Sequence, residues 1–228
     1  MMDEAAAASR LVLWFSPGFP TGAFGFSHGL EWAVEAGDVS NGADLTDWIA
    51  ALMEQGGGWS DAVLVVLAYR AARAKDGAAL AELAELALAL QPSKERRLET
   101  SVQGDAFLKA VETGWPNEAV SRLRAASPGP CALPVAAGTA SAGANLPLAA
   151  SLSAFLSAFA ASLVSAAIRL APIGQSDGLR VLAALEPLIA RMAARASQAD
   201  LDDIGTFAIR SDIASMRHET QFTRLFRS

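Results

Sequence analysis

A long stretch without charge restricts the folds that this chain can adopt. No charged residue occurs from Ala125 to Ile168. The most apolar part, Leu146 to Ala167, is long enough to cross a bilayer, but it relies on alanine and contains several serines. We interpret it as a buried helix with small residues that let other helices approach closely, so we expect no contact with a membrane. A membrane-embedded helical bundle remains the alternative.

Helical spacing recurs along nearly the whole chain. Leu45, Trp48, Ile49 and Leu52 follow the i, i+3, i+4, i+7 pattern, whereas strict apolar–polar alternation is absent. We therefore predict one all-α domain over residues 1–228, a helical bundle of about eight to ten helices. Helices are expected over about 23–36, 44–55, 60–75, 78–90, 95–113, 117–126 and 146–171, then from 176 with a kink at Pro187, and finally from a cap at Ser211 or Asp212. The other expected starts are a cap at Asp44, a cap at Ser60 or Asp61, a start after Ser93 and a cap at Asn117. Residues 135–144 are low in complexity and are predicted as loop or weak helix.

The segment from Trp14 to Trp32, WFSPGFPTGAFGFSHGLEW, combines aromatic residues with Gly and Pro. Pro and Gly favour tight turns, and aromatic side chains bury large apolar areas. We predict a structured turn that packs into the core or against a partner, with a helix beginning near Thr21 to Phe24. The candidate structural and interface residues are Ser16, Pro17, Pro20, Gly22, Phe24, His28 and Glu31.

Charge is distributed unevenly, with a net value of −6. Acidic residues dominate the first quarter of the chain and arginines dominate the last nineteen residues, without a basic groove, so partners are expected to be proteins and not nucleic acid. The single Cys131 allows no internal disulfide, and acids near the start are unlike a signal peptide. We expect a cytoplasmic protein.

Motifs for catalysis are almost absent. Phosphate-binding loops of the GxxxxGK[ST] and GxGxxG types and the zinc motif HExxH do not occur. Gly25 to Gly29 matches GxSxG around Ser27, but that motif requires a strand that is not predicted. His28 and Glu31 lie one helical turn apart, so a small acid/base enzyme using them is the second alternative. We expect no catalytic role, no bound cofactor and no resident metal, and we interpret Arg96-Arg97 as a solvated face.

The chain ends in the segment HETQFTRLFRS, which mixes arginines with Phe and Leu. A terminus so rich in anchoring side chains is expected to be tied down or to dock on a partner.

Four blocks together carry a family resemblance. SPGFPTGAFGFSHGLEWAVE, ETSVQGDAFLKA, RLAPIGQSDGLRVLAALEP and DIASMRHETQFTRLFRS occur in this order and span nearly the whole chain. They resemble the signature blocks of the urease accessory protein UreF family.

The resemblance implies an all-α homodimer that acts as a scaffold in urease maturation. Its implied partners are UreD (also called UreH), the nickel-carrying GTPase UreG and apo-urease, with modulation of GTP hydrolysis by UreG and nickel only in transit. It also implies that residues 217–228 form a docking tail that binds UreD. The implied contact residues are Arg217, His218, Glu219, Phe222, Arg224, Leu225, Phe226, Arg227 and Ser228, where Phe222 replaces the family's usual Tyr.

Overall fold

The computed structural model describes residues 3–228. This part of the chain contains eleven α-helices, two short 3-10 helices and no strand, so the predicted all-α fold is confirmed. The α-helices are α1 (Glu4–Trp14), α2 (Leu30–Glu35), α3 (Gly42–Gln55), α4 (Gly57–Arg73), α5 (Gly77–Ala89), α6 (Lys94–Gly114), α7 (Glu118–Ala126), α8 (Leu133–Gly143), α9 (Leu148–Leu170), α10 (Gln175–Ala196) and α11 (Ile209–His218). The 3-10 helices are η1 (Ala23–Gly25) and η2 (Leu201–Asp203).

Side-chain caps begin several helices as the sequence predicts. Ser93 accepts a hydrogen bond from the Arg96 amide at the start of α6, and Asn117 accepts one from the Val120 amide at the start of α7. The cap of α3 is Asn41 and not the predicted Asp44, which lies in the first turn. Each cap pairs amides that the helix itself leaves free.

Three predicted boundaries are wrong. The helix expected from Ala23 begins only at Leu30, because residues 23–25 form η1 and a left-handed pair, His28 and Gly29, separates the two helices. The predicted caps of the third helix, Ser60 and Asp61, are buried within α4. The last helix begins at Ile209, so Ser211 lies inside α11.

Two helices are additions to the prediction. Helix α1 was not predicted, and residues 135–144 lie mostly in α8, a regular helix buried between α4 and α6. Small side chains explain this burial: a Cβ atom at Gly138 would lie 2.3 Å from the Val65 carbonyl oxygen. A Cβ at Gly104 of α6 would lie 2.1 Å from the Cys131 carbonyl oxygen. The low complexity of this region therefore reflects close helix packing.

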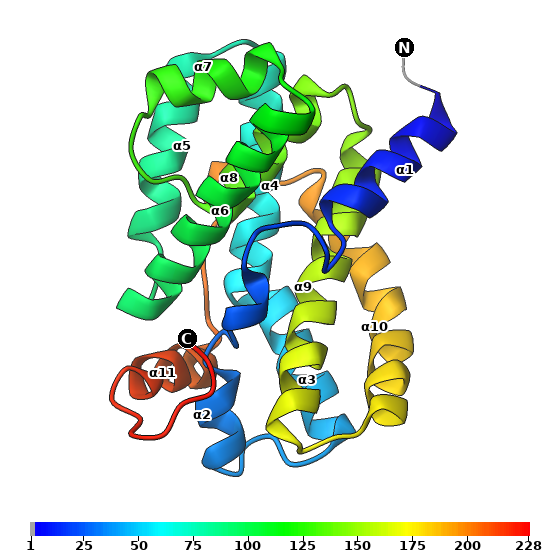
Figure 1. Cartoon of the computed structure of the whole chain (residues 1–228), viewed down its shortest axis with the longest axis vertical. Helices are drawn as coiled ribbons and strands as arrows, with labels where there is room; N and C mark the ends of the chain where they lie inside the picture. Colours follow the sequence, from blue (N-terminus) through cyan, green and yellow to red (C-terminus); the bar gives the residue numbers. More distant parts are fainter. Residues whose placement is uncertain (1–2) are drawn as a thin grey trace.

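Helix α4 runs through the middle of the molecule and links its two ends (Figure 1). One apolar cluster joins α2, α3, α4, α9 and α10. A second cluster joins α1 with the helices α4, α5, α6, α7 and α8. In Figure 1, α5 to α8 form one end, while α2, α3 and α11 form the other. The C-terminal segment therefore belongs to the α2 and α11 end.

Helix α9 is the one helix among residues 3–228 that is long and apolar enough to cross a membrane, with a mean hydropathy of 1.8. Half of its most apolar window is buried inside the molecule, mainly against α10, with further contacts to α4 and α2. This packing agrees with our interpretation of a buried core helix.

Candidate functional site

The tail, residues 217–228, folds back against the segment that precedes α2. The Arg227 amide donates to the Gly25 carbonyl oxygen at 2.9 Å, and the Ser27 amide donates to the Ser228 carbonyl oxygen at 2.8 Å. The Ser27 hydroxyl donates to the same Ser228 oxygen. Figure 1 shows the C-terminus beside α2 and α11. The two segments that the sequence singles out are thus in direct contact.

Glu31 is the main anchor of the tail. Its buried carboxylate accepts hydrogen bonds from the Leu225 amide at 2.6 Å and from the Phe226 amide at 2.9 Å. Because a carboxylate accepts from several donors at once, one side chain fixes two successive backbone amides. The same carboxylate lies 3.1 Å from Nε2 of His218.

His218 joins this anchor to α6. Its ring is completely buried, and Nδ1 lies 2.5 Å from a carboxylate oxygen of Glu95. Both ring nitrogens therefore face carboxylates. Glu95 also accepts a hydrogen bond from Arg224 of the tail at 2.6 Å. His218, predicted as a partner contact, is an internal link between α11, α2 and α6.

A glycine permits this close packing. Gly29 has φ +76°, and a Cβ atom there would lie 2.8 Å from the backbone nitrogen of Ser215 in α11. The preceding His28 is also left-handed, with φ 61°. A left-handed pair reverses the chain and brings the start of α2 against α11, which places Glu31 beneath the tail.

The tail has one buried face and one exposed face. Phe226, Gln221 and Ser228 are buried, and Ser228 donates its hydroxyl to Glu99 at 2.5 Å. Phe222 is fully exposed and Leu225 is 61% exposed. The remaining predicted tail residues, Arg217, Glu219, Arg224 and Arg227, lie at or near the surface. The expectation that Phe226 fills a partner's pocket is wrong for this conformation, because Phe226 packs in the chain's own core.

The aromatic turn before α2 packs into the core, as predicted. Phe19 lies 5.1 Å from Phe107 between ring centroids, and Trp14 lies 5.8 Å from the same ring. Phe24 stays exposed and carries the Arg169 guanidinium 4.0 Å from its ring centroid. Of the other predicted turn residues, Ser16 donates to the Leu13 carbonyl oxygen, Gly22 has φ +74°, and Pro17 and Pro20 are exposed.

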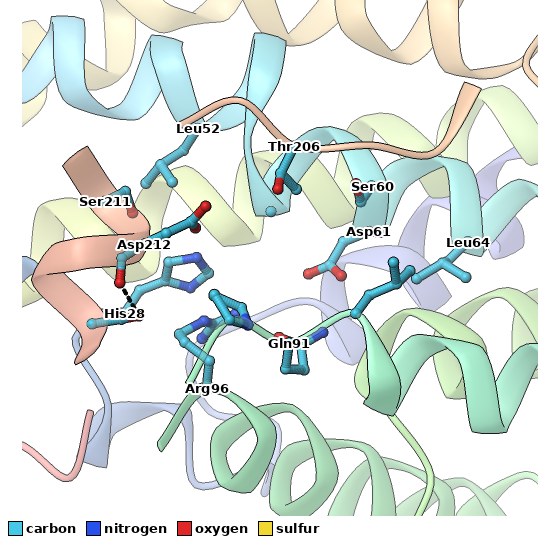
Figure 2. Close-up of a pocket in the computed structure, with 14 residues that line it drawn as sticks. His28, Leu52, Ser60, Asp61, Leu64, Gln91, Arg96, Thr206, Ser211 and Asp212 are labelled. Atoms are coloured by element: carbon cyan, nitrogen blue, oxygen red, sulfur yellow. Dashed lines mark hydrogen bonds between the residues drawn. The ribbon is translucent and has the colours of Figure 1, made fainter. Parts of the chain in front are cut away.

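A buried polar cluster lies on the other side of this turn, between α4 and α6. It consists of His28, Asp61, Arg96 and Glu99, and Arg96 pairs with Glu99. The cluster borders an apolar cavity of about 210 Å³, and Figure 2 shows His28, Asp61 and Arg96 around a smaller space of about 20 Å³. Arg96 was predicted to lie on a solvated face; it is buried because Glu99, one turn further along α6, neutralises it.

Burial changes the titration of these groups. Desolvation, with the Arg96 charge, lowers the pKa of His28 to about 4. Desolvation also raises the pKa of Asp61 to about 7, and the nearby Glu99 charge adds to this effect. Burial acts to raise the pKa of Glu99, but the Arg96 charge, the nearby His28 and the hydrogen bond from Ser228 outweigh it and hold that pKa below its ordinary value.

The arrangements considered for an enzyme are not assembled. The carboxylate of Glu31 binds the tail and His218, while Nδ1 of His28 lies 3.8 Å from Glu99. His28 and Glu31 are therefore not paired, so the arrangement considered as the acid/base alternative is not formed. Ser27 donates to Ser228 and follows no strand. Across residues 3–228, no group of three or more His, Cys, Asp and Glu side chains could hold a metal ion.

Sequence reasoning missed Glu95 and Glu99, the two carboxylates of α6 that hold the tail. The two residues lie four apart, which places both carboxylates on one face of the helix. This spacing was the one weak indication that they act together. Cys131 is buried, and burial raises the pKa of its thiol to about 12.

Comparison with known proteins identifies the family. The UreF family model matches residues 39–186, more than half of the chain. The chain belongs to the UreF family. "Urease accessory protein UreF" of Rhodopseudomonas palustris (strain HaA2) is 51% identical over 226 residues, covering 99% of this chain and 95% of that protein. The UreF of strain BisA53 is 53% identical over 224 residues, covering 98% and 94%.

A relative from another genus gives the same result. The urease accessory protein UreF of Methylobacterium radiotolerans is 50% identical over 225 residues, covering 99% of this chain and 98% of that protein. The UreF resemblance of the four sequence blocks is confirmed. These relatives are named as accessory proteins and not as enzymes. Their names agree with the absence of a His28–Glu31 pair and of a strand before Ser27 in the described residues.

Proposed function

We propose that this UreF chain is a scaffold in urease maturation that binds UreD (UreH) through its tail and recruits UreG to apo-urease. Family membership supports the accessory role, and the observation that favours the tail is the exposure of Phe222 and Leu225 on a firmly anchored segment. Exposed large apolar side chains on an ordered backbone are typical of protein-binding sites. Nickel would pass through the assembly as cargo.

Helix α11 extends this apolar surface. Ile209, Ile213 and Met216 are about half exposed and follow the i, i+4, i+7 spacing of one helix face. The helix and the tail follow one another in the chain and are held to the same carboxylates, Glu31 and Glu95. We propose that UreD covers this face of α11 together with the exposed side of the tail.

The remaining parts of the proposal rest on the family. We propose a homodimer that forms through small-residue helix faces, a cytoplasmic location and an effect on GTP hydrolysis by UreG through positioning. The exposed side of α9 offers such a face around Ser157. Light scattering on the purified chain and on Ser157→Arg tests the dimer, because a buried arginine at a close helix contact would leave a monomer.

Point variants on the exposed side of the tail test UreD binding. Phe222→Ser with Leu225→Ser removes apolar area without touching the buried anchors. We expect this pair to abolish co-purification with UreD from the same source while circular dichroism and thermal unfolding stay unchanged.

The matched control is Val12→Ser with Leu13→Ser, because these residues are also exposed and apolar but belong to α1, which lies apart from α11 and the C-terminus in Figure 1. Loss of UreD binding in both pairs would indicate a general effect of surface hydrophobicity. Full binding by the tail pair would overturn the proposed docking site.

A further inference from the structure

A groove of about 400 Å³ separates α3 from the segment that leads into α11. Its wall includes Asp38, Asp44, Asp47, Trp48, Phe207 and Arg210. None of these residues belongs to the tail, so the groove is a second surface, next to the one proposed for UreD.

The groove is acidic. Asp38 pairs with Arg210, and Asp44 accepts hydrogen bonds from Ser40 and Asn41. The Ser40 hydroxyl is the main cause that lowers the pKa of Asp44, which therefore stays ionised. Asp47 lies one turn further along α3, is exposed and has no ion pair within residues 3–228. Three aspartates thus face one arginine.

Apolar and hydrogen-bonding groups accompany the charge. Phe207 is 73% exposed at the edge of the groove, beside the exposed Ile209. Trp48 is buried in the wall, and its indole N–H has no hydrogen-bond partner in the described part of the chain. The exposed apolar surface at this edge of the groove is therefore that of Phe207 and Ile209.

We propose that this groove binds a positively charged peptide segment of a partner protein. A lysine or arginine of that segment would pair with Asp47, and an apolar neighbour would pack on Phe207. The ion pair between Arg210 and Asp38 shows that the groove accepts a guanidinium. That pair is exposed and contributes little stability, so an incoming cation can replace it.

Other occupants fit less well. Aspartates repel nucleic acid, and the acidic side chains here do not form a group that could hold a metal ion. The groove shares no residue with the tail, but it includes Ile209, which also belongs to the α11 face proposed for UreD. The test is separate from UreD binding, because it uses a probe peptide and Asp47, which is not part of the UreD surface.

Fluorescence polarisation with a defined probe tests the proposal. The probe is a fluorescein-labelled octapeptide of alternating arginine and leucine, and the comparison peptide has glutamate in place of arginine. We expect the full chain to bind the first probe and not the second, with affinity that falls as salt is raised. Asp47→Asn should weaken binding by about three- to tenfold, since one charge pair is lost.

Two further variants give the test its specificity. Glu82→Gln removes the same charge from an exposed position of α5, far from the groove, and should leave binding unchanged. Arg210→Ala frees Asp38 and should tighten binding. Equal losses in Asp47→Asn and Glu82→Gln would show non-specific attraction and would overturn the proposal. Absence of binding at millimolar probe would overturn it as well.

Discussion

Asp61 makes the stability of this protein depend on pH in an unusual direction. Its carboxyl group is buried in α4 beside Arg96 and Glu99, and desolvation raises its pKa from 3.8 to about 7. Between these two values the unfolded chain has lost the proton that the folded chain keeps. The free energy of unfolding therefore falls as the pH rises from about 4 to about 7 and then levels off.

The Asp61→Asn variant should remove this loss. One unit of pKa shift corresponds to about 1.4 kcal/mol, so the titration of Asp61 lowers the stability of the parent chain by roughly 2 to 3 kcal/mol between pH 5 and pH 8. Asparagine resembles the protonated carboxyl group in shape and does not titrate. We expect the free energy of unfolding of the variant, relative to that of the parent chain, to rise by that amount between pH 5 and pH 8.

Urea unfolding followed by circular dichroism at both pH values measures the difference. Asp47→Asn is the matched control, because it makes the same chemical change at an exposed position of α3. A stability difference between Asp61→Asn and the parent chain that stays constant with pH would refute the reasoning. It would mean that Asp61 is ionised and paired in the folded chain throughout.

Two further predictions concern the same buried region. The pKa of His28 falls to about 4 on burial, so the folded chain loses stability as the pH drops from about 6.5 toward 4. Asparagine suits the left-handed backbone at this position. In urea unfolding, His28→Asn should reduce the loss of stability between pH 7.5 and pH 5 by roughly 2 kcal/mol. Gly104→Ala should lower the free energy of unfolding by more than about 3 kcal/mol, because its Cβ would lie 2.1 Å from the Cys131 carbonyl oxygen; Gly114→Ala, which meets no atom within 4 Å, should lower the midpoint of thermal unfolding little or not at all.

The helices that the sequence predicts well include those that begin at a capping residue. Helix α6 follows Ser93 and α7 follows Asn117, as expected. Helix α1 was missed because its first turns are mostly alanine, which gives helix propensity without an apolar stripe. Helix α8 was predicted only weakly because its small side chains have no amphipathic pattern, being buried between two helices.

The site was predicted in parts but not as a whole. The sequence marks the turn before α2 and the tail as unusual, but nothing in either segment says that they touch across nearly two hundred residues. The sequence also does not show which side chains pair with one another. Helical spacing suggested a pair of Glu31 with His28, whereas the structure pairs Glu31 with His218 and the tail amides. Left-handed backbone at Gly29 breaks the helical register on which that pairing relied.

The contacts of the tail also determine which experiments on it can be interpreted. A chain that ends at Met216 would lose His218, Arg224 and the tail amides together, leaving the carboxylates of Glu31 and Glu95 without their partners. Leaving a buried charged group without its partner costs about 3–5 kcal/mol, a large fraction of the stability of a typical domain. Failure of the truncated chain to bind UreD would then report unfolding as readily as a lost docking site. Substitutions at Phe222 and Leu225 avoid this ambiguity, because their side chains are exposed and make none of the contacts that hold the tail to Glu31 and Glu95.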